Sequence, residues 1–533
     1  MTYPIYRIAC GKNDNSLELT RETLGAKAFN LLGMAQMKLP VPPAFVLGTQ
    51  FTTDPQLARV AGLPQTWQSA LEQLQIASGK TLGDSRNPLL LSVRSGAPIS
   101  MPGMMETLLN IGLCDNTLEG FIRQTGNPRL AWDCYRRLIA NFGEVVDGID
   151  PQLFEQPLER LCNKIDERQL DFAALRDLSQ QYLELYQTVA QRPFPQSPQR
   201  QLQCAIEAVI QSWHAAKAKH YRQSNHISED LGTAVTVQAM VFGNSGAHAG
   251  AGVGFTRNPT TGDKVPWIDF LLNAQGEDVV SGRRNARGSD DLARWFPKPW
   301  HDLQEAMRRL EHHFKDMQDI EFTIDNGQLA LLQTRSGKRT HFAAAQLALD
   351  FADEGIITLD EAWQRLEKLP KDCLIRRRVS DQLGQQHNPI TTADTASTGV
   401  ASGKLCLSEA KAIYFKQKGE NVILVRPDAE TKDIKALEIA EGLLTQRGAR
   451  TSHAAVVARH LGKVCLVGAQ KTQIIEESGK VIINDREFLE GDALTLDGNT
   501  GNIYSGILET VEEPDPLLTE RINQLKLKRQ PTH

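Results

Sequence analysis

One histidine, His453, opens an apolar segment in the stretch GARTSHAAVVARHLGKVCLVG, residues 448–468. The residues before it predict a buried strand (442–446) and a turn, and HAAVVARHLG predicts a helix. The imidazole would then lie in the first helical turn, with Thr451 or Ser452 as N-cap, where free backbone N–H groups favour anions and oppose protonation. A neutral imidazole in this position can attack a phosphoryl group and hold it as a phosphoramidate. The alternative is a helix-terminal histidine that only packs or caps.

A second group of reactive side chains lies in DIEFTIDNGQLALLQTRSG, which predicts a β-hairpin with Asp325-Asn326-Gly327 at its turn. Asp319 and Glu321 share one strand face, and Gln333 and Arg335 share a face of the next strand, because side chains alternate along a strand. Carboxylate and amide oxygens suit Mg²⁺, and a guanidinium suits phosphate. The sequence has no Walker A motif, so a P-loop is not expected. A solvent-facing ladder of polar residues is the alternative.

The bulk composition fits an ordinary globular protein of about three domains. The chain has 533 residues and a net charge of −5, so bulk electrostatics favour neither nucleic acid nor a membrane surface. It contains no signal-peptide-like start and no apolar run of spanning length. Eight cysteines are scattered without CxxC spacing, which is typical of a reduced, cytoplasmic protein.

The elements that must position these residues change character along the chain. The first 190 residues mix predicted strands (41–49 and 88–96) with amphipathic helices, and a Pro-rich joint at 192–200 precedes a further predicted helix, AIEAVIQSWHAAKAKHYR. A β-rich, Gly-rich region begins at Thr233. Residues 341–370 predict helix, and the polar segment 376–399 predicts a linker.

Whole strings of the sequence resemble one enzyme family. TSHAAVVAR is similar to the swivelling phosphohistidine domain of the pyruvate phosphate dikinase and phosphoenolpyruvate synthase family. GAKAFNLLGMAQMKLPVPPAF, LSVRSGAPISMPGMMETLLNIGL, VQAMVFGNSGAHAGAGVGFTRNPTTGD, LLNAQGEDVVSG and the hairpin string are similar to the ATP-grasp domain of the dikinases. The resemblance implies an α/β multidomain (α+β) protein, an ATP-grasp domain followed by a phosphohistidine β/β/α domain.

The resemblance also implies roles for individual residues. His453 would be the phosphohistidine and Arg335 would contact the terminal phosphates of ATP, supported by Asp319. Glu321 and Gln333 would bind Mg²⁺. The other nucleotide contacts implied are Lys27 and Arg94 on phosphates, Gly103 and Thr107 in the closing SMPGMMET loop, and Gln238 near the adenine or ribose.

Several of these residues have plainer interpretations. Lys27 could be an ordinary helix-start lysine, and the Met-rich loop could fill the core. Arg136 and Arg137 are candidates for a second phosphate-bearing group or for a solvated helix face. Two positions depart from the family pattern: Arg450 stands where the dikinases have Met, and Asp269 where they usually have Glu.

The expected domains are 1–340 (ATP-grasp-like, with a helical connection at 190–232), 341–399 (helical segment and swivel linker), 400–508 (phosphohistidine carrier) and 509–533 (tail). The 27 residues after 506 are too few for the (β/α)₈ barrel of full dikinases, which needs about 250 residues.

Three functional interpretations follow. The first is an ATP-dependent dikinase-like phosphotransferase that passes the β-phosphoryl through His453 to a small molecule, while phosphate or water takes the γ-phosphoryl and AMP is released. The second is the donor and carrier subunit of a split enzyme, with the acceptor bound by a separate protein. The third is a catalytically silent, nucleotide-binding regulatory protein. The oligomeric state stays open.

Overall fold

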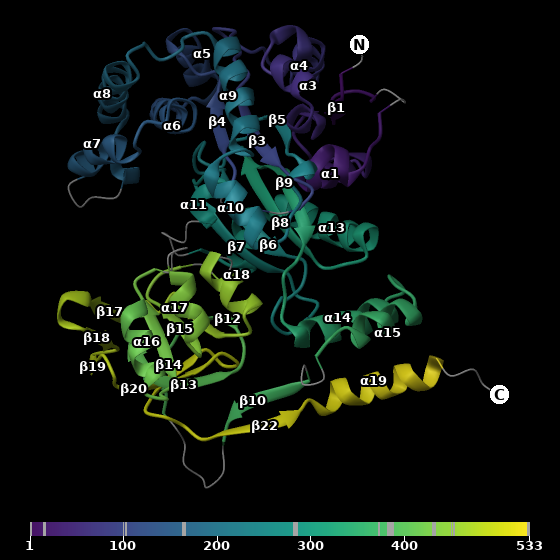
Figure 1. The fold of residues 1–533 in the computed structure, drawn as a ribbon, viewed down its shortest axis with the longest axis vertical. Coiled ribbons are helices and arrows are strands. Elements are labelled where there is room, and N and C mark those ends of the chain that lie inside the picture. The colour runs from purple at the N-terminus through teal and green to yellow at the C-terminus, as the bar shows by residue number, and fades with distance from the viewer. Residues whose placement is uncertain are drawn as a thin grey trace. The chain divides into compact units, whose positions relative to one another are not determined.

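The computed structural model describes residues 3–13, 17–99, 101, 104–162, 167–280, 286–370, 374–380, 388–428, 433–448, 450 and 453–529. The chain forms two compact units. Unit 1 comprises residues 1–248 with 324–326 and 330–334, and unit 2 comprises the remainder. Figure 1 traces the elements in chain order.

Unit 1 is built on a five-stranded antiparallel sheet in the order β1-β2-β5-β3-β4. Its strands are β1 (Ile5–Ile8), β2 (Ala44–Leu47), β3 (Leu91–Gly96), β4 (Thr107–Ile111) and β5 (Ala234–Ala239). Its helices are α1 (Arg21–Gln36), α2 (Gln50–Thr53), α3 (Pro55–Val60), α4 (Pro64–Ser78), α5 (Asp115–Thr125), α6 (Pro128–Asp147), α7 (Gln152–Cys162), α8 (Phe172–Ala190), α9 (Pro198–Ser212) and α10 (Ala216–Ser224).

The core of unit 1 covers one face of this sheet. Val93 of β3 is paired with Leu108 on one side and Val237 on the other, and all three are fully buried among the core residues of α4, α6 and α9. Because side chains alternate along a strand, the next residues project from the opposite face. That face is packed by α1.

The helix predicted across 205–222 is two helices, α9 and α10. The carbonyl of Trp213, just past the end of α9, accepts a hydrogen bond of 2.8 Å from Nη1 of the buried Arg222, whose guanidinium stacks 3.9 Å from the Trp213 ring. This contact accompanies the break between α9 and α10, in a segment whose apolar pattern by itself predicts one helix.

A four-stranded sheet in the order β7-β6-β8-β9 has most of its residues in the first part of unit 2, and residues 324–326 and 330–334 of its last two strands belong to unit 1. Its strands are β6 (Gly250–Phe255), β7 (Trp267–Leu272), β8 (Gln318–Asp325) and β9 (Gln328–Ser336), and the helices are α11 (Gly276–Val280), α12 (Ser289–Trp295), α13 (Pro297–Phe314), α14 (His341–Asp353) and α15 (Leu359–Glu367). The predicted hairpin is confirmed: β8 and β9 are neighbours, and Asn326 and Gly327 both have positive φ at its turn. The tip of this hairpin lies in unit 1, where Asp325 accepts hydrogen bonds from the backbone N–H of Phe242 (2.9 Å) and from Ser245 (2.9 Å).

The second part of unit 2, Thr391–Ser505, is a three-layer domain that we call the C-terminal sandwich. Its eight-stranded sheet has the order β11-β21-β20-β13-β14-β15-β16-β12, and β13 to β16 run parallel. The alternation along β14 explains the layers: Val422 and Leu424 face the helices, and Ile423 and Val425 face a small sheet formed by β17, β18 and β19. The expected β/β/α arrangement is therefore confirmed.

The elements of the sandwich are β11 (Thr391–Thr392), β12 (Asp394–Ser397), β13 (Val400–Cys406), α16 (Glu409–Gln417), β14 (Val422–Arg426), α17 (Ile434–Ile439), β15 (Gly442–Thr445), α18 (His453–His460), β16 (Val464–Val467), β17 (Thr472–Ile475), β18 (Lys480–Ile483), β19 (Arg486–Leu489), β20 (Ala493–Asp497) and β21 (Asn502–Ser505).

The segment 376–399 differs from the irregular linker predicted for it. It contributes most of β10 (Ile375–Val379), which pairs with β22 (Thr510–Pro514), and it contains β11 and β12 of the sandwich sheet. The β10–β22 ribbon is held by backbone pairing and by ion pairs such as Arg377–Glu512, so it needs no apolar periodicity. The tail contains the helix expected for it, α19 (Pro516–Arg529), which packs on α14 and α15 through Leu518 and Leu525. The sandwich therefore starts before residue 400, at β11. The tail is packed against α14 and α15 by its helix.

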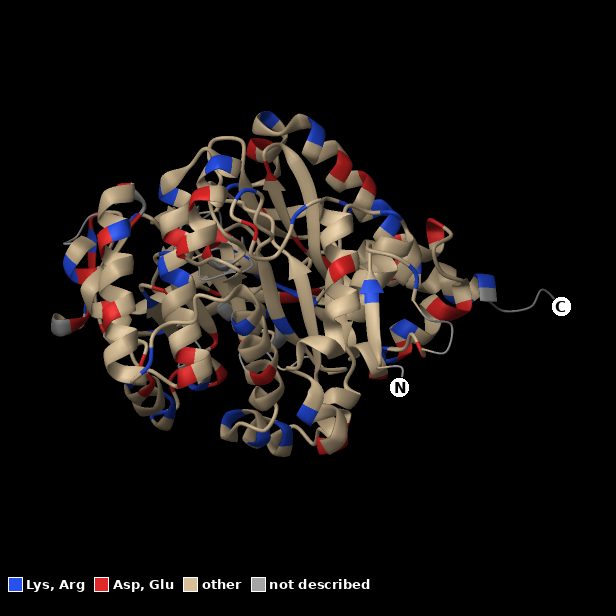
Figure 2. Cartoon of the chain, turned by 90° about the horizontal axis from the view of Figure 1, so that it is seen from above, with Lys and Arg blue, Asp and Glu red and all other residues tan. Residues whose placement is uncertain are grey.

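Basic and acidic residues are interspersed in the view of Figure 2, in keeping with the small net charge. Within the described ranges, no helix has both the length and the apolar content to cross a membrane.

Candidate functional site

Four of the predicted nucleotide contacts gather on the face of the unit 1 sheet that α1 packs against, opposite the main core, and we call it the polar face. Arg94 of β3 is the cross-strand partner of Thr107 on β4 and of Thr236 on β5. Gln238, two residues beyond Thr236, projects from the same face. The strand register therefore brings together residues that are far apart in sequence.

Lys27 joins this face through an unusual helix start. Gly25 has φ 72° and ψ 158°, which breaks α1, so that Lys27 lies in the first turn of its continuous part. A Cβ at Gly25 would lie 1.7 Å from the carbonyl oxygen of Gly96, and the N–H of Ala26 donates to Ala97 O at 3.0 Å. A Cβ built on Gly96 would be 3.6 Å from the Lys27 Cβ, and Gly96 shares the polar face with Arg94. The glycine thus fixes the lysine over the strand that carries Arg94.

Hydrogen bonds fix Gln238 and the helix that carries Lys27. Gln238 is 2% exposed, and its Nε2 donates to Pro42 O at 3.0 Å, which fixes the orientation of the amide. One turn after Lys27, Asn30 donates to Thr334 O on β9 at 2.7 Å. Since Thr334 follows the buried Gln333, this bond ties α1 to the strand that carries the predicted Mg²⁺ ligand.

Asp319, Glu321 and Arg335 form a charged group on the hairpin. Arg335 Nε lies 2.7 Å from Asp319 Oδ2. Burial raises the pKa of Asp319 above its usual value, the neighbouring Glu321 raises that pKa further, and Arg335 opposes both effects. The Asp319 carboxylate is the main cause that raises the pKa of Arg335. Asp319 and Glu321 lie two residues apart on β8, so their side chains project from the same face of the strand.

The sandwich presents His453 as the first residue of α18, as the sequence predicts. The helix is fixed to the sheet by Ala455 and Ala458, which are fully buried, and the preceding turn starts at Gly448, with φ 126°. The side chain of His453, the predicted caps Thr451 and Ser452, and Gly103 lie outside the described residues.

Arg459, at the end of the string TSHAAVVAR, received no role from the sequence. It is 2% exposed, its Nε donates to Ala396 O at 2.9 Å, and its Nη2 donates to Arg450 O at 2.8 Å. Its Nη1 is buried and has no hydrogen-bond partner among the described residues, and burial lowers the pKa of the Arg459 guanidinium to about 10. The only signal in the sequence is a cation inside an otherwise apolar helix.

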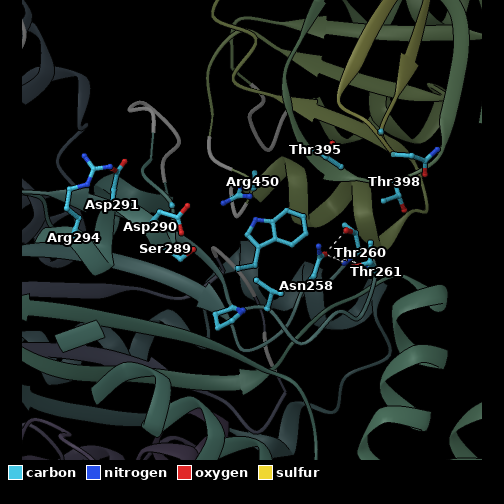
Figure 3. Close-up of a pocket in the computed structure, with 16 residues that line it drawn as sticks. Asn258, Thr260, Thr261, Ser289, Asp290, Asp291, Arg294, Thr395, Thr398 and Arg450 are labelled. Atoms are coloured by element: carbon cyan, nitrogen blue, oxygen red, sulfur yellow. Dashed lines mark hydrogen bonds and ion pairs between the residues drawn. The ribbon is translucent and has the colours of Figure 1, made fainter. Parts of the chain in front are cut away.

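Arg450, three residues before His453, lines a cavity of about 680 Å³ within unit 2 (Figure 3). The cavity is bounded on one side by Asn258, Trp267 and Arg294, and on the sandwich side by Thr395 and Thr398. Figure 3 shows the hydrogen bonds by which Asn258 holds Thr260 and Thr261 in the adjoining turn.

The candidates Arg136 and Arg137 have structural partners instead. Arg136 is 5% exposed, and both guanidinium groups are ion-paired with Asp133 and Glu167. The pairing accounts for their charge without a phosphate ligand. Among the described residues, no group of three or more His, Cys, Asp or Glu side chains could hold a metal ion by itself.

Comparison with known families agrees with these elements. The model of the pyruvate phosphate dikinase AMP/ATP-binding domain matches residues 55–288 and 298–355, which is more than half of the chain. The chain belongs to the pyruvate phosphate dikinase family. The mobile domain of PEP-utilising enzymes matches residues 418–501, within the C-terminal sandwich.

Curated relatives give the same picture. The pyruvate, phosphate dikinase of Clostridium symbiosum is 42% identical over 500 residues, which cover 92% of this chain and 57% of the relative. The enzyme of Giardia intestinalis is 40% identical over 507 residues, covering 93% of this chain and 57% of the relative. A chloroplastic enzyme of Arabidopsis thaliana is 40% identical over 492 residues, covering 91% and 51%. The chain thus spans somewhat more than half the length of these dikinases.

Proposed function

We propose that this protein is an ATP-dependent, dikinase-like phosphotransferase that moves the β-phosphoryl group of ATP to His453 and then to an acceptor. AMP is released, and phosphate or water takes the γ-phosphoryl. The observation that carries the proposal is the presence, on one chain, of the dikinase AMP/ATP-binding domain and the mobile domain of PEP-utilising enzymes. A nucleotide domain alone would support binding only, whereas the pair supplies a donor and a carrier.

The polar face supplies the groups that phosphates need. Lys27 and Arg94 of this face would bind phosphate oxygens. Arg335, which lies on β9 instead, would contact the terminal phosphates, where its guanidinium can form two hydrogen bonds at once. Thr107, together with Gly103, would close over the nucleotide, and Gln238 would lie near the adenine or ribose.

Mg²⁺ fits the oxygen donors present. Glu321 and Gln333 would hold it, and Asp319 would support them. Mg²⁺ characteristically uses one or two protein oxygens together with substrate phosphates, so a cluster of three acids is not required. When bound, the ion would neutralise charge on the β- and γ-phosphates.

His453 would act as the nucleophile. It is the first residue of α18, and an imidazole attacks phosphorus in its neutral form, through a ring nitrogen that carries a lone pair. A bond forms between this nitrogen and the β-phosphorus, the bond from that phosphorus to the oxygen bridging the α- and β-phosphates breaks, and AMP leaves with that oxygen. His453 then carries the β- and γ-phosphates together. The bond between the γ-phosphorus and the bridging oxygen breaks as the γ-phosphoryl passes to phosphate or water, which leaves one phosphoryl group on His453. The phosphoryl group then passes from His453 to the acceptor.

The acceptor is proposed to be a small molecule, bound by this protein or by a partner. The relatives are named pyruvate, phosphate dikinases, and this sequence spans 57% of the first of them. A donor and carrier subunit of a split dikinase is therefore the second candidate, and pyruvate is the first acceptor to test.

The test is to incubate the protein with Mg²⁺ and ATP labelled at the β-phosphate, and to measure acid-labile label on the protein and AMP in solution. We expect label on the wild type and none on His453→Ala. Parallel reactions with and without inorganic phosphate identify the γ-phosphoryl acceptor, and a chase with pyruvate tests acceptor transfer. Unlabelled wild type that still binds ATP would support the silent regulatory protein and overturn the proposal.

A further inference from the structure

Arg450 connects the turn before His453 to strand β7 by three contacts. Its Nη2 donates to the carbonyl of Ile268 at 3.1 Å, its Nε lies 3.5 Å from Asp269 Oδ1, and its guanidinium carbon lies 4.9 Å from the centre of the Trp267 ring. The three partners are consecutive residues of one strand. Asp269 and Arg450, which are 181 residues apart in the sequence, are thus held in contact.

Removal of the Arg450 guanidinium would take a charged partner away from a buried carboxylate and a buried ring. Asp269 is 3% exposed, and Trp267 is 7% exposed, so the guanidinium meets partners that are largely removed from water. On the sandwich side, Asp394 of β12 lies within electrostatic range of both Arg450 and Asp269. Arg450 therefore stands among two carboxylates that belong to different domains and that would otherwise repel each other.

Arg450 and the His453 turn also form one mechanical piece. Arg459, on the helix that His453 begins, donates to the backbone oxygen of Arg450 at 2.8 Å and to Ala396 of β12 at 2.9 Å. The same guanidinium lies 5.8 Å from the Trp267 ring. Arg450 is therefore held to β7 by its side chain and, through its backbone oxygen and Arg459, to the helix that His453 begins.

We propose that Arg450 is a positioning residue that latches the carrier turn to Trp267, Ile268 and Asp269 and so holds His453 in the arrangement in which it is loaded from ATP. The latch rests on the proposed function. It names the contact that sets the fraction of molecules in which the carrier turn is held against β7. Breaking the latch lowers the loading rate without altering the nucleotide contacts of unit 1.

The test compares Arg450→Met with the matched control Arg447→Met, which removes an exposed arginine three residues earlier in the same connection. We expect Arg450→Met to lower the rate of acid-labile labelling from β-labelled ATP by about tenfold or more, since a small misplacement of reacting groups is enough for such a loss. ATP affinity and the thermal unfolding temperature should stay at the wild-type values, and Arg447→Met should label normally.

A double-mutant cycle separates a latch from a general structural effect. Asp269→Asn should slow labelling, and adding it to Arg450→Met should cost little more, because both changes break the same contact. Additive losses, or a normal labelling rate in Arg450→Met, would overturn the latch.

A second measurement keeps the latch testable if the wild type takes no label, which would refute the proposed function alone. Trp267→Phe is made in the wild type, in Arg450→Met and in Arg447→Met, and the emission of each Trp267→Phe protein is subtracted from that of the same protein with Trp267 intact. The resulting Trp267 emission should differ from wild type in Arg450→Met and should match wild type in Arg447→Met. An unchanged Trp267 spectrum in Arg450→Met would show that the guanidinium does not dock there.

Discussion

Replacing Gly25 by alanine should disrupt the polar face more than any ordinary glycine substitution. The backbone at Gly25, with φ 72° and ψ 158°, lies in a region that is essentially restricted to glycine and costs about 1–3 kcal/mol for other residues. The new Cβ would also lie 1.7 Å from the Gly96 carbonyl oxygen, a backbone atom that cannot rotate away. Forced overpacking of this kind adds about 1–3 kcal/mol. We therefore expect Gly25→Ala to lower the free energy of unfolding of unit 1 by about 3–5 kcal/mol.

The matched control is Gly79→Ala. Gly79 also has positive φ, 66°, but a Cβ there meets nothing within 4 Å, so only the backbone strain of about 1–2 kcal/mol applies. Both variants would be compared with the wild type by urea unfolding and by ATP titration. Because Lys27 follows Gly25 by two residues, Gly25→Ala should also weaken ATP binding by about tenfold, the typical value of one charge-assisted hydrogen bond, whereas Gly79→Ala should not. If Gly25→Ala is no more destabilising than Gly79→Ala and binds ATP normally, the close approach of α1 and β3 does not position Lys27.

Three further perturbations test other parts of the site. Arg335→Ala should abolish acid-labile labelling of His453 while circular dichroism stays unchanged, with the exposed Arg308→Ala as control; labelling near the wild-type rate would contradict the role of Arg335. Arg459→Met should slow labelling more than tenfold yet change the free energy of unfolding by less than about 2 kcal/mol. The change in stability is small because the variant loses two hydrogen bonds but no longer buries a cation. Large destabilisation with normal labelling would make Arg459 purely structural. Burial raises the pKa of Asp394 above 3.8, so between 3.8 and that raised pKa the folded protein binds more protons than the unfolded chain and stability falls as pH rises. Asp394→Asn should flatten this slope in urea unfolding series between about pH 4 and 7, and an unchanged slope would assign it to other groups.

The sequence by itself determined the elements whose signals are local. Strand β15 and helix α18 around His453 follow from an apolar run, a glycine turn and a helical apolar pattern. The β8–β9 hairpin follows from alternation and from Asn326-Gly327, which tolerate positive φ. The family could also be recognised from the sequence, because long stretches of residues resemble it.

Only the tertiary structure decided which residues meet. The register of β3 against β4 and β5 places Arg94 beside Thr107 on one face with Gln238, and no local pattern encodes a pairing between strands so far apart in sequence. The polar strand β10 was predicted as linker because its partner β22 lies more than a hundred residues away and the ribbon buries no apolar face. The contacts of Arg450 and the burial of Arg459 depend on strands β7 and β12, which approach that turn only when the chain is folded. Local periodicity fixes what each segment becomes, whereas pairing and burial between distant segments fix what each side chain can do.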